Sequence, residues 1–201
     1  MKKFINLYYI FQHVREYHPN VVPLPAREDI VDAYHGTTKE YALQVIKSKK
    51  FHKSINPGDW LGHGIYFWEN NPGRAKMWAI EKAGNEEAAV VLKTKVRLGK
   101  CLDLSNSSMA SIISVAYDHL KDYYKFTSQP LPKNDPNDKI GHYLDCEVMN
   151  YLPKIVEFDT IRAPFYEGEK LFPGSFLLNQ SHIQIVVINE RNIVGDISIF
   201  S

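Results

Sequence analysis

Cysteine is scarce in this sequence and long apolar runs are missing. The 201 residues include two cysteines, Cys101 and Cys146, which lie far apart and form no Cys-x-x-Cys pair. They are too few for a disulfide framework or a cysteine-rich zinc site. We interpret both as buried or incidental thiols in a reducing compartment, and we expect a cytoplasmic protein without a metal site.

No segment approaches the roughly 20 apolar residues of a membrane-spanning helix, so we expect no membrane partner. The N-terminal run from Phe4 to Phe11 is short and contains Asn6. It leads into polar residues without a small-residue cleavage site, which argues against a signal peptide. The formal net charge of +1 gives no electrostatic argument for nucleic acid, although a small total can hide a local basic patch.

The length fits one domain, and the order of the predicted elements indicates an α+β fold. Strands separated by helices in irregular order do not fit a regular doubly wound sheet. The loop from Ala163 to Ser181 is long enough to be either functional or disordered. Apolar periodicity and turn residues predict helices near 4–17, 39–50, 74–82, 107–124 and 141–153, and strands near 30–38, 65–68, 88–104, 155–162, 183–188 and 193–200.

The sharpest local feature is Tyr34-His35-Gly36-Thr37 at the end of a predicted strand. Gly36 would let a ligand approach the backbone closely, and His35 and Thr37 offer an imidazole and a hydroxyl beside it. This pattern fits a site that binds a small polar ligand. The structural alternative is that Thr37 or Thr38 caps the next helix and that His35 packs in the core.

The second feature is GHGIYFW, residues 62–68. Two glycines next to a Tyr-Phe-Trp run place aromatic faces beside bare backbone, which suits a wall facing a planar ring. Ordinary core packing is the alternative for Phe67 and Trp68.

Together, YHGTT at 34–38 and GHGIYFWENNPGRAKMWA at 62–79 resemble the poly(ADP-ribose) polymerase and diphtheria-toxin branch of the ADP-ribosyltransferases, which is marked by a His-Tyr-Glu triad. The likeness continues over VLKTKVRLGKCLDL at 91–104, so that it covers 34–104 well and 160–197 loosely. It implies one ADP-ribosyltransferase-like domain, with split mixed or antiparallel sheets around an NAD cleft and peripheral helices. Outside the likeness, we expect residues 1–33 to form an N-terminal helical or linker extension and residues 105–155 a helical insertion.

The resemblance implies that NAD is the substrate and assigns roles around its nicotinamide. His35 would hydrogen-bond a hydroxyl of the nicotinamide-side ribose. Gly36 would pair its backbone N–H and C=O with the carboxamide, and Thr37 would add a hydroxyl contact.

The second motif would form the rest of the cofactor site. Tyr66 would stack on the nicotinamide ring, with Gly64 in the same binding segment. Trp78 or Met77 would form the opposite wall, because the spacing after Tyr66 leaves that choice open by one residue.

The third triad position departs from the family. The late strand SHIQIVV carries no glutamate, and Gln184, then His182, are our candidates for that position. Glu167, followed in the same loop by Glu169, is the candidate for activating the acceptor; a solvated surface charge is the alternative. Arg162 could meet a phosphate of NAD or of the acceptor, or could be a surface charge.

We therefore predict a mono-ADP-ribosyltransferase that modifies a macromolecular acceptor, with protein and nucleic acid both open. By analogy at the level of the fold, a toxin or defence effector is expected, with an antitoxin among its candidate partners. The alternatives are an NAD glycohydrolase, an enzyme similar to RNA 2′-phosphotransferases, and a non-catalytic module that binds NAD or ADP-ribose.

Overall fold

The computed structural model describes residues 23–137 and 141–201. The helix expected at 4–17 lies outside the described residues. Within the described ranges the chain has an α+β fold, as expected. No helix in this part of the chain is long and apolar enough to cross a membrane.

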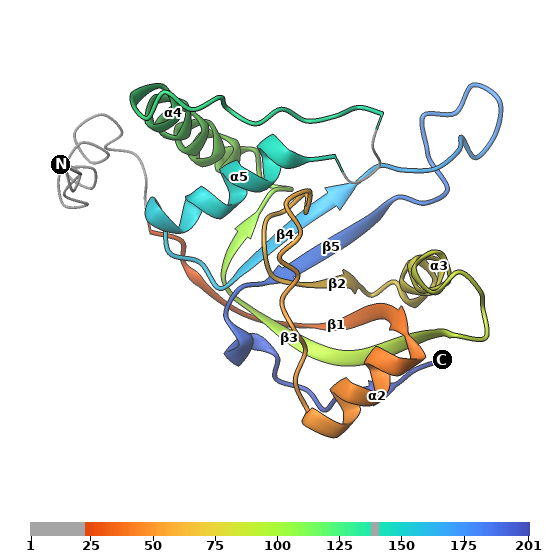
Figure 1. Ribbon diagram of the computed structural model, residues 1–201. Helices are drawn as coiled ribbons and strands as arrows, with labels where there is room; N and C mark the ends of the chain where they lie inside the picture. The colour runs from red at the N-terminus through yellow and green to blue at the C-terminus, as the bar shows by residue number, and fades with distance from the viewer. Residues whose placement is uncertain (1–22, 138–140) are drawn as a thin grey trace. The chain divides into compact units, whose positions relative to one another are not determined.

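The fold contains a mixed sheet of six strands (Figure 1). The strand order is β1-β2-β5-β4-β3-β6, and β1 also pairs with β3, so that five strands close into a barrel-like ring. We expected split sheets, whereas the structure has one continuous sheet. Only β3 and β4 run parallel among the paired strands of the described residues. The strands are β1 (Ala26–Thr38), β2 (Ile65–Glu69), β3 (Ala89–Asp103), β4 (Thr160–Phe165), β5 (His182–Val187) and β6 (Ser198–Ile199).

The ring closes along β3, which pairs with both β1 and β4. Its pairing with β1 runs from Ala89 to Lys100, and Cys101–Asp103 at its end pair with β4. Gly99 has φ +60°, and a Cβ there would collide with the side chain of Asp159. A glycine therefore fits the positive φ and the close approach to Asp159 just before β3 meets β4.

Two helices cover opposite faces of the sheet. On one face, which we call the α2 face, Ala42 and Val45 of α2 (Lys39–Ser48) pack with Phe67 and other buried residues. On the other, the α3 face, Ala75 of α3 (Pro72–Ala83) packs with Trp68. Because successive strand residues point to opposite faces, each candidate side chain can be assigned to one of them.

Both helices begin with side-chain caps. Thr38, rather than Thr37, caps α2, and its hydroxyl accepts from the Tyr41 amide at 3.4 Å. Asn71 caps α3 by accepting from the Arg74 amide at 2.9 Å. These caps satisfy amides that have no partner within the helix.

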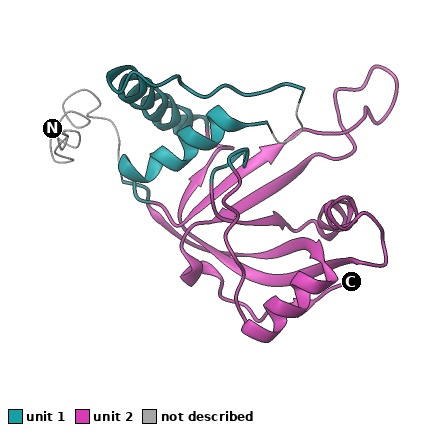
Figure 2. Ribbon diagram, viewed as in Figure 1, with its two compact units in different colours: residues 1–24, 57–62, 107–157 teal, residues 25–56, 63–106, 158–201 magenta. Residues whose placement is uncertain are grey.

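The chain divides into two compact units (Figure 2). One contains residues 57–62 and 107–157, with the α-helices α4 (Ala110–Phe126) and α5 (Tyr143–Tyr151) and the 3₁₀ turns η1 (Ser107–Met109) and η2 (Leu152–Lys154). The other contains residues 25–56, 63–106 and 158–201, with the whole sheet, α2, α3 and the turn η3 (Glu190–Asn192). Every candidate site residue belongs to this second unit. That residues 105–155 are an insertion into one domain stays a prediction.

Three strand boundaries were wrong. β4 begins at Thr160, because the apolar residues Val156 and Phe158 are buried in an irregular connection instead of a strand. The strand expected at 193–200 shortens to β6, since the amides of Val194 and Gly195 both donate to the Lys95 carbonyl and interrupt regular pairing. β1 begins at Ala26, inside the expected extension.

Candidate functional site

β1 and β2 separate at the His-Gly-Thr motif. They pair at Ala33↔Glu69 and Tyr34↔Trp68, and the described residues show no further register pair between them. Just beyond, His35 Nδ1 lies 2.8 Å from the Tyr66 carbonyl oxygen. A carbonyl can only accept, so Nδ1 carries the proton. A side chain thus bridges the two strands where their backbone ladder stops.

The imidazole of His35 lies on the α2 face. Its Nε2 is buried and has no hydrogen-bond partner. Burial lowers the pKa of His35 to about 4, so the ring is neutral and Nε2 is an open acceptor. Three rings surround it, with centroids at 5.3 to 5.9 Å: Phe51, Phe67 and Tyr41.

The packing of α3 against β1 leaves no room for a side chain at Gly36. A Cβ at Gly36 would collide with the Ala75 carbonyl, because the backbone of the helix lies directly against β1. The expected close approach of a ligand is therefore closed on that side, and the edge of β1 beyond its last pair with β2 is the remaining route. Thr37 is fully buried, and its hydroxyl has no partner.

A glycine at position 64 also has a structural explanation, because a Cβ there would collide with the Val186 side chain of β5. The glycine brings the start of β2 close to β5. Its expected contact with the cofactor stays a prediction.

The aromatic residues of the second motif divide between the faces. Phe67 is fully buried on the α2 face, whereas Trp68 belongs to the cluster on the α3 face. Alternation along β2 assigns Tyr66 to the same face as Trp68. Trp78 packs against the same cluster, with its ring centroid 6.1 Å from that of Trp68. Met77 is 46% exposed and does not belong to this cluster. The structure thus places Trp78, rather than Met77, on the face that Tyr66 shares.

β5 brings the third-position candidates to the same face. Gln184 lies opposite Trp68 in the register of β2 and β5. His182 Nδ1 lies 2.7 Å from the Gln180 carbonyl oxygen and donates to it, and His182 Nε2 accepts from the Gln184 amide nitrogen at 3.1 Å. Burial lowers the pKa of His182, which keeps the ring neutral. With both nitrogens engaged, His182 orients Gln184.

Glu167 reaches the same group through an ion pair. Its carboxylate lies 2.8 Å from the Arg74 guanidinium, and the Arg74 side chain is 14% exposed. The guanidinium also lies over the Trp68 ring, 5.9 Å from its centroid. Arg74 Nε and Trp68 Nε1 are buried N–H groups without a partner. Unpaired buried donors are costly, and they suit a ligand that brings an oxygen.

Arg162 is mostly buried in an ion-pair network and is not a surface charge, whereas its contact with a phosphate stays a prediction. Its guanidinium makes two hydrogen bonds to Glu69, at 2.6 and 3.0 Å, and a further contact to Asp103 at 3.2 Å. These partners raise the pKa of Arg162 despite its burial. The network links β2, β3 and β4 and is a structural feature of the sheet.

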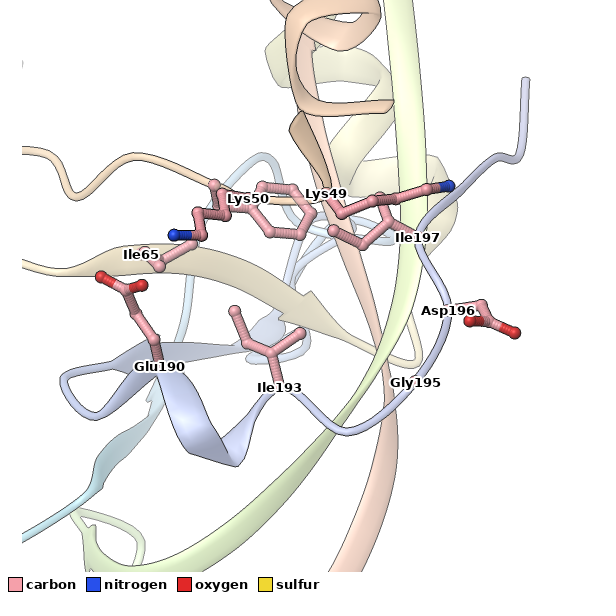
Figure 3. A pocket seen from close by; sticks show the side chains of 9 residues that line it. Lys49, Lys50, Ile65, Glu190, Ile193, Gly195, Asp196 and Ile197 are labelled. Carbon is pink, nitrogen blue, oxygen red and sulfur yellow. The ribbon is translucent and has the colours of Figure 1, made fainter. Parts of the chain in front are cut away.

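A cavity of about 420 Å³ opens elsewhere on this unit (Figure 3). It is lined by apolar residues that include Phe51 and Ile65 and by charged residues that include Lys50 and Glu190. None of the candidate site residues lines it, so it is separate from the group around Tyr66.

Trp68 and Arg74 were missed as site residues by the sequence reasoning. The period of two along β2 could have placed Trp68 beside Tyr66. No local pattern indicates Arg74, because its partner Glu167 lies far along the chain.

Comparison with known proteins adds little. No family model matches the chain, and no curated protein matches it. A solved structure described as the crystal structure of an anti-CRISPR protein matches with a TM-score of 0.38 and 11% identity, over 88% of this chain and 99% of that chain. A likeness of this order carries no argument about fold or function.

Proposed function

We propose that this chain is an NAD-dependent ADP-ribosyltransferase, which releases nicotinamide and transfers ADP-ribose to a macromolecular acceptor. The observation that carries the proposal is the position of β2 between β1 and β5. This arrangement brings His35, Tyr66 and Gln184, which are far apart in sequence, onto three neighbouring strands.

The α3 face fits a nicotinamide half. Tyr66 and Trp78 supply aromatic surfaces for a planar ring. The unpartnered N–H groups of Trp68 and Arg74 can donate to an oxygen of the dinucleotide. His35 lies on the opposite, α2 face with Nε2 buried, so the ribose contact that the resemblance implies requires a hydroxyl to enter the gap where β1 and β2 separate.

The chemistry follows from the charge that develops on the ribose. The glycosidic bond breaks, its electron pair stays with the departing nicotinamide nitrogen, and C1′ becomes cation-like. Stacking and hydrogen bonds that fix the leaving group lower the cost of reaching this state. The acceptor atom then bonds to C1′ and loses a proton, for which Glu167 is the candidate base. The amide of Gln184 can orient groups but cannot act as a general base.

NAD labelled in both halves tests the proposal. Nicotinamide release with adenylate label on a macromolecule supports transfer, whereas free ADP-ribose supports hydrolysis and binding without turnover supports a non-catalytic module. Trp78→Ala should lose most of the turnover. Met77→Ala, its exposed neighbour in the same helix, is the matched control and should keep it. Equal turnover in both variants would remove Trp78 from the site.

A further inference from the structure

The cavity of Figure 3 is formed by three segments that are distant in sequence. Residues 49–51 follow α2, Ile65 begins β2, and residues 190–197 run from η3 to β6. All three belong to the unit that contains the sheet. The volume of about 420 Å³ lies towards the low end of small-molecule sites, which are roughly 300–1,000 Å³. Its size therefore suits a small ligand.

Hydrogen bonds hold the segment of residues 190–197 against the sheet. The Gly195 amide donates to the Lys95 carbonyl of β3 at 3.3 Å, and the Gly195 carbonyl accepts from the Thr94 hydroxyl at 2.9 Å. At the end of α2, Lys49 caps the helix in a left-handed conformation. These contacts preform the cavity, which lowers the entropic cost of binding a ligand there.

Much of the lining is apolar and belongs to the core of the sheet unit. Phe51 is 4% exposed and Ile65 is 1% exposed. Ile197 is part of the same core cluster, and Ile193 packs against it. A polar group placed against these side chains would lose its hydrogen bonds to water, whereas an aliphatic or aromatic group would gain by being buried.

Four charged residues complete the lining, and their charges balance: Lys49, Lys50, Glu190 and Asp196. Figure 3 shows the Lys50 ammonium and the Glu190 carboxylate at the same end of the cavity, beside Ile65. Among the described residues no ion pair joins these two groups. Opposite charges that face one cavity without pairing suit a ligand that carries both signs. The balance also disfavours nucleotides and other anions, which an excess of Lys and Arg attracts.

We infer that this cavity binds a free apolar α-amino acid. The ammonium of the ligand would pair with Glu190 and its carboxylate with Lys50, because an α-amino acid carries both groups on one carbon. The side chain of the ligand would pack against Phe51 and Ile193. The end of a protein chain offers only one of the two charges and fits less well. The inference does not depend on the proposed function, since neither Tyr66 nor any other candidate site residue lines the cavity.

The first experiment is calorimetric titration of the purified chain with L-phenylalanine and with L-leucine. At least one should bind saturably in the low millimolar range or tighter, the scale for a ligand of this size. Two analogues of phenylalanine test the recognition of both charges: 2-phenylethylamine, which lacks the carboxylate, and 3-phenylpropionate, which lacks the ammonium. Each should bind at least about fivefold more weakly than L-phenylalanine, or fail to bind. No saturable binding of either amino acid up to about 20 mM, or equal binding of an analogue, would overturn the inference.

Variants of the two charged residues test the same contacts from the side of the protein. Lys50→Gln and Glu190→Gln should each weaken binding of the amino acid at least about fivefold, and both change exposed side chains, so the fold should be kept. Lys47→Gln is the matched control, because Lys47 is exposed at the end of α2 and does not line the cavity. Equal affinity in all four proteins would contradict the assignment.

The second experiment locates the ligand by amide chemical shifts of the ¹⁵N-labelled chain. Titration with the amino acid should shift the signals of Phe51, Ile65 and Ile193. Trp78→Ala, which changes the proposed NAD face, should bind the amino acid like the wild type. Shifts confined to the α3 face, or loss of binding in Trp78→Ala, would overturn the inference. Binding of the amino acid at the cavity without any binding of NAD would support the inference and refute only the proposed function.

Discussion

At the scale of single residues, alternation along β1 and β2 places neighbouring motif residues on opposite faces of the sheet. His35 and Phe67 lie on the α2 face among buried rings, whereas Tyr66 and Trp68 lie on the α3 face with Trp78. The sequence could show which residues were unusual. It could not show that the His35 ring hydrogen-bonds the Tyr66 backbone, because that contact depends on where β1 and β2 separate.

His35 should make stability depend on pH. Its pKa is about 4 in the folded chain and 6.5 when the ring is exposed in the unfolded chain, so between these pH values only the unfolded chain binds the proton. The contribution of His35 to the free energy of unfolding is therefore fully present above pH 6.5, and up to about 3 kcal/mol is lost as the pH falls towards 4. His35→Gln, which can still donate to the Tyr66 carbonyl but does not titrate, should show a flatter profile in chemical denaturation. Parallel profiles for the two proteins would contradict the burial of a neutral ring.

Tyr66 and Phe67 form a matched pair of neighbours on opposite faces. Tyr66→Ala should lose most of the NAD turnover and keep a melting temperature near that of the wild type, because Tyr66 is half-buried. Phe67→Ala should lower stability by about 3–5 kcal/mol, because it removes a fully buried ring. Thermal melting alongside the turnover assay separates these outcomes. A large loss of stability in Tyr66→Ala would mean that Tyr66 is a core residue and not a ligand-binding one.

At the scale of elements, the position of α3 is what assembles the site. α3 packs its backbone on Gly36 and presents Trp78 and Arg74 towards Trp68. Amphipathic periodicity and the Asn71-Pro72 start were sufficient to predict this helix. Its packing against β1 was not predictable, since a glycine that admits a ligand and one that admits a helix look identical in sequence.

Gly36→Ala should therefore destabilise the protein and reduce turnover together. The added methyl group collides with the backbone of α3, which can yield only by moving the helix, and overpacking of this kind costs about 1–3 kcal/mol. Gly73→Ala is the control in α3 itself. A Cβ there meets only the Asn71 side chain at 3.7 Å, so this variant should be neutral or more stable by about 0.4–1 kcal/mol. If Gly36→Ala melts like the wild type while NAD affinity falls, the glycine serves the ligand and not the helix.

At the scale of the whole molecule, the sequence was sufficient to predict the fold class but not the order of the strands in the sheet. The α+β class and most elements follow from local periodicity. The closed strand order depends on pairing between distant segments, such as β3 with both β1 and β4, which local patterns do not encode. The same holds for Arg162, whose buried partners Glu69 and Asp103 come from two other strands.

The late strand predicts single transfer. Elongation of a polymer requires a group that activates a ribose hydroxyl of the previous unit, and β5 carries Gln184, held by His182, where the resembling family has a glutamate. Mass spectrometry of the modified acceptor should show single ADP-ribose increments. A ladder of long chains would mean that another residue fills the third position. Glu167→Gln should reduce transfer, because Glu167 is the candidate base. Unchanged transfer would mean that Glu167 does not activate the acceptor and has only its structural ion pair with Arg74.

The proposed function requires that the face with Tyr66 and Trp78 binds NAD. Calorimetric titration of the purified chain with NAD measures this binding without an acceptor or turnover. We expect saturable binding with a dissociation constant at or below roughly 1 mM, the upper end for enzyme substrates. Binding should be weakened at least about tenfold in Tyr66→Ala and unaffected in Met77→Ala. No heat of binding at millimolar NAD, or equal binding in Tyr66→Ala, would contradict it.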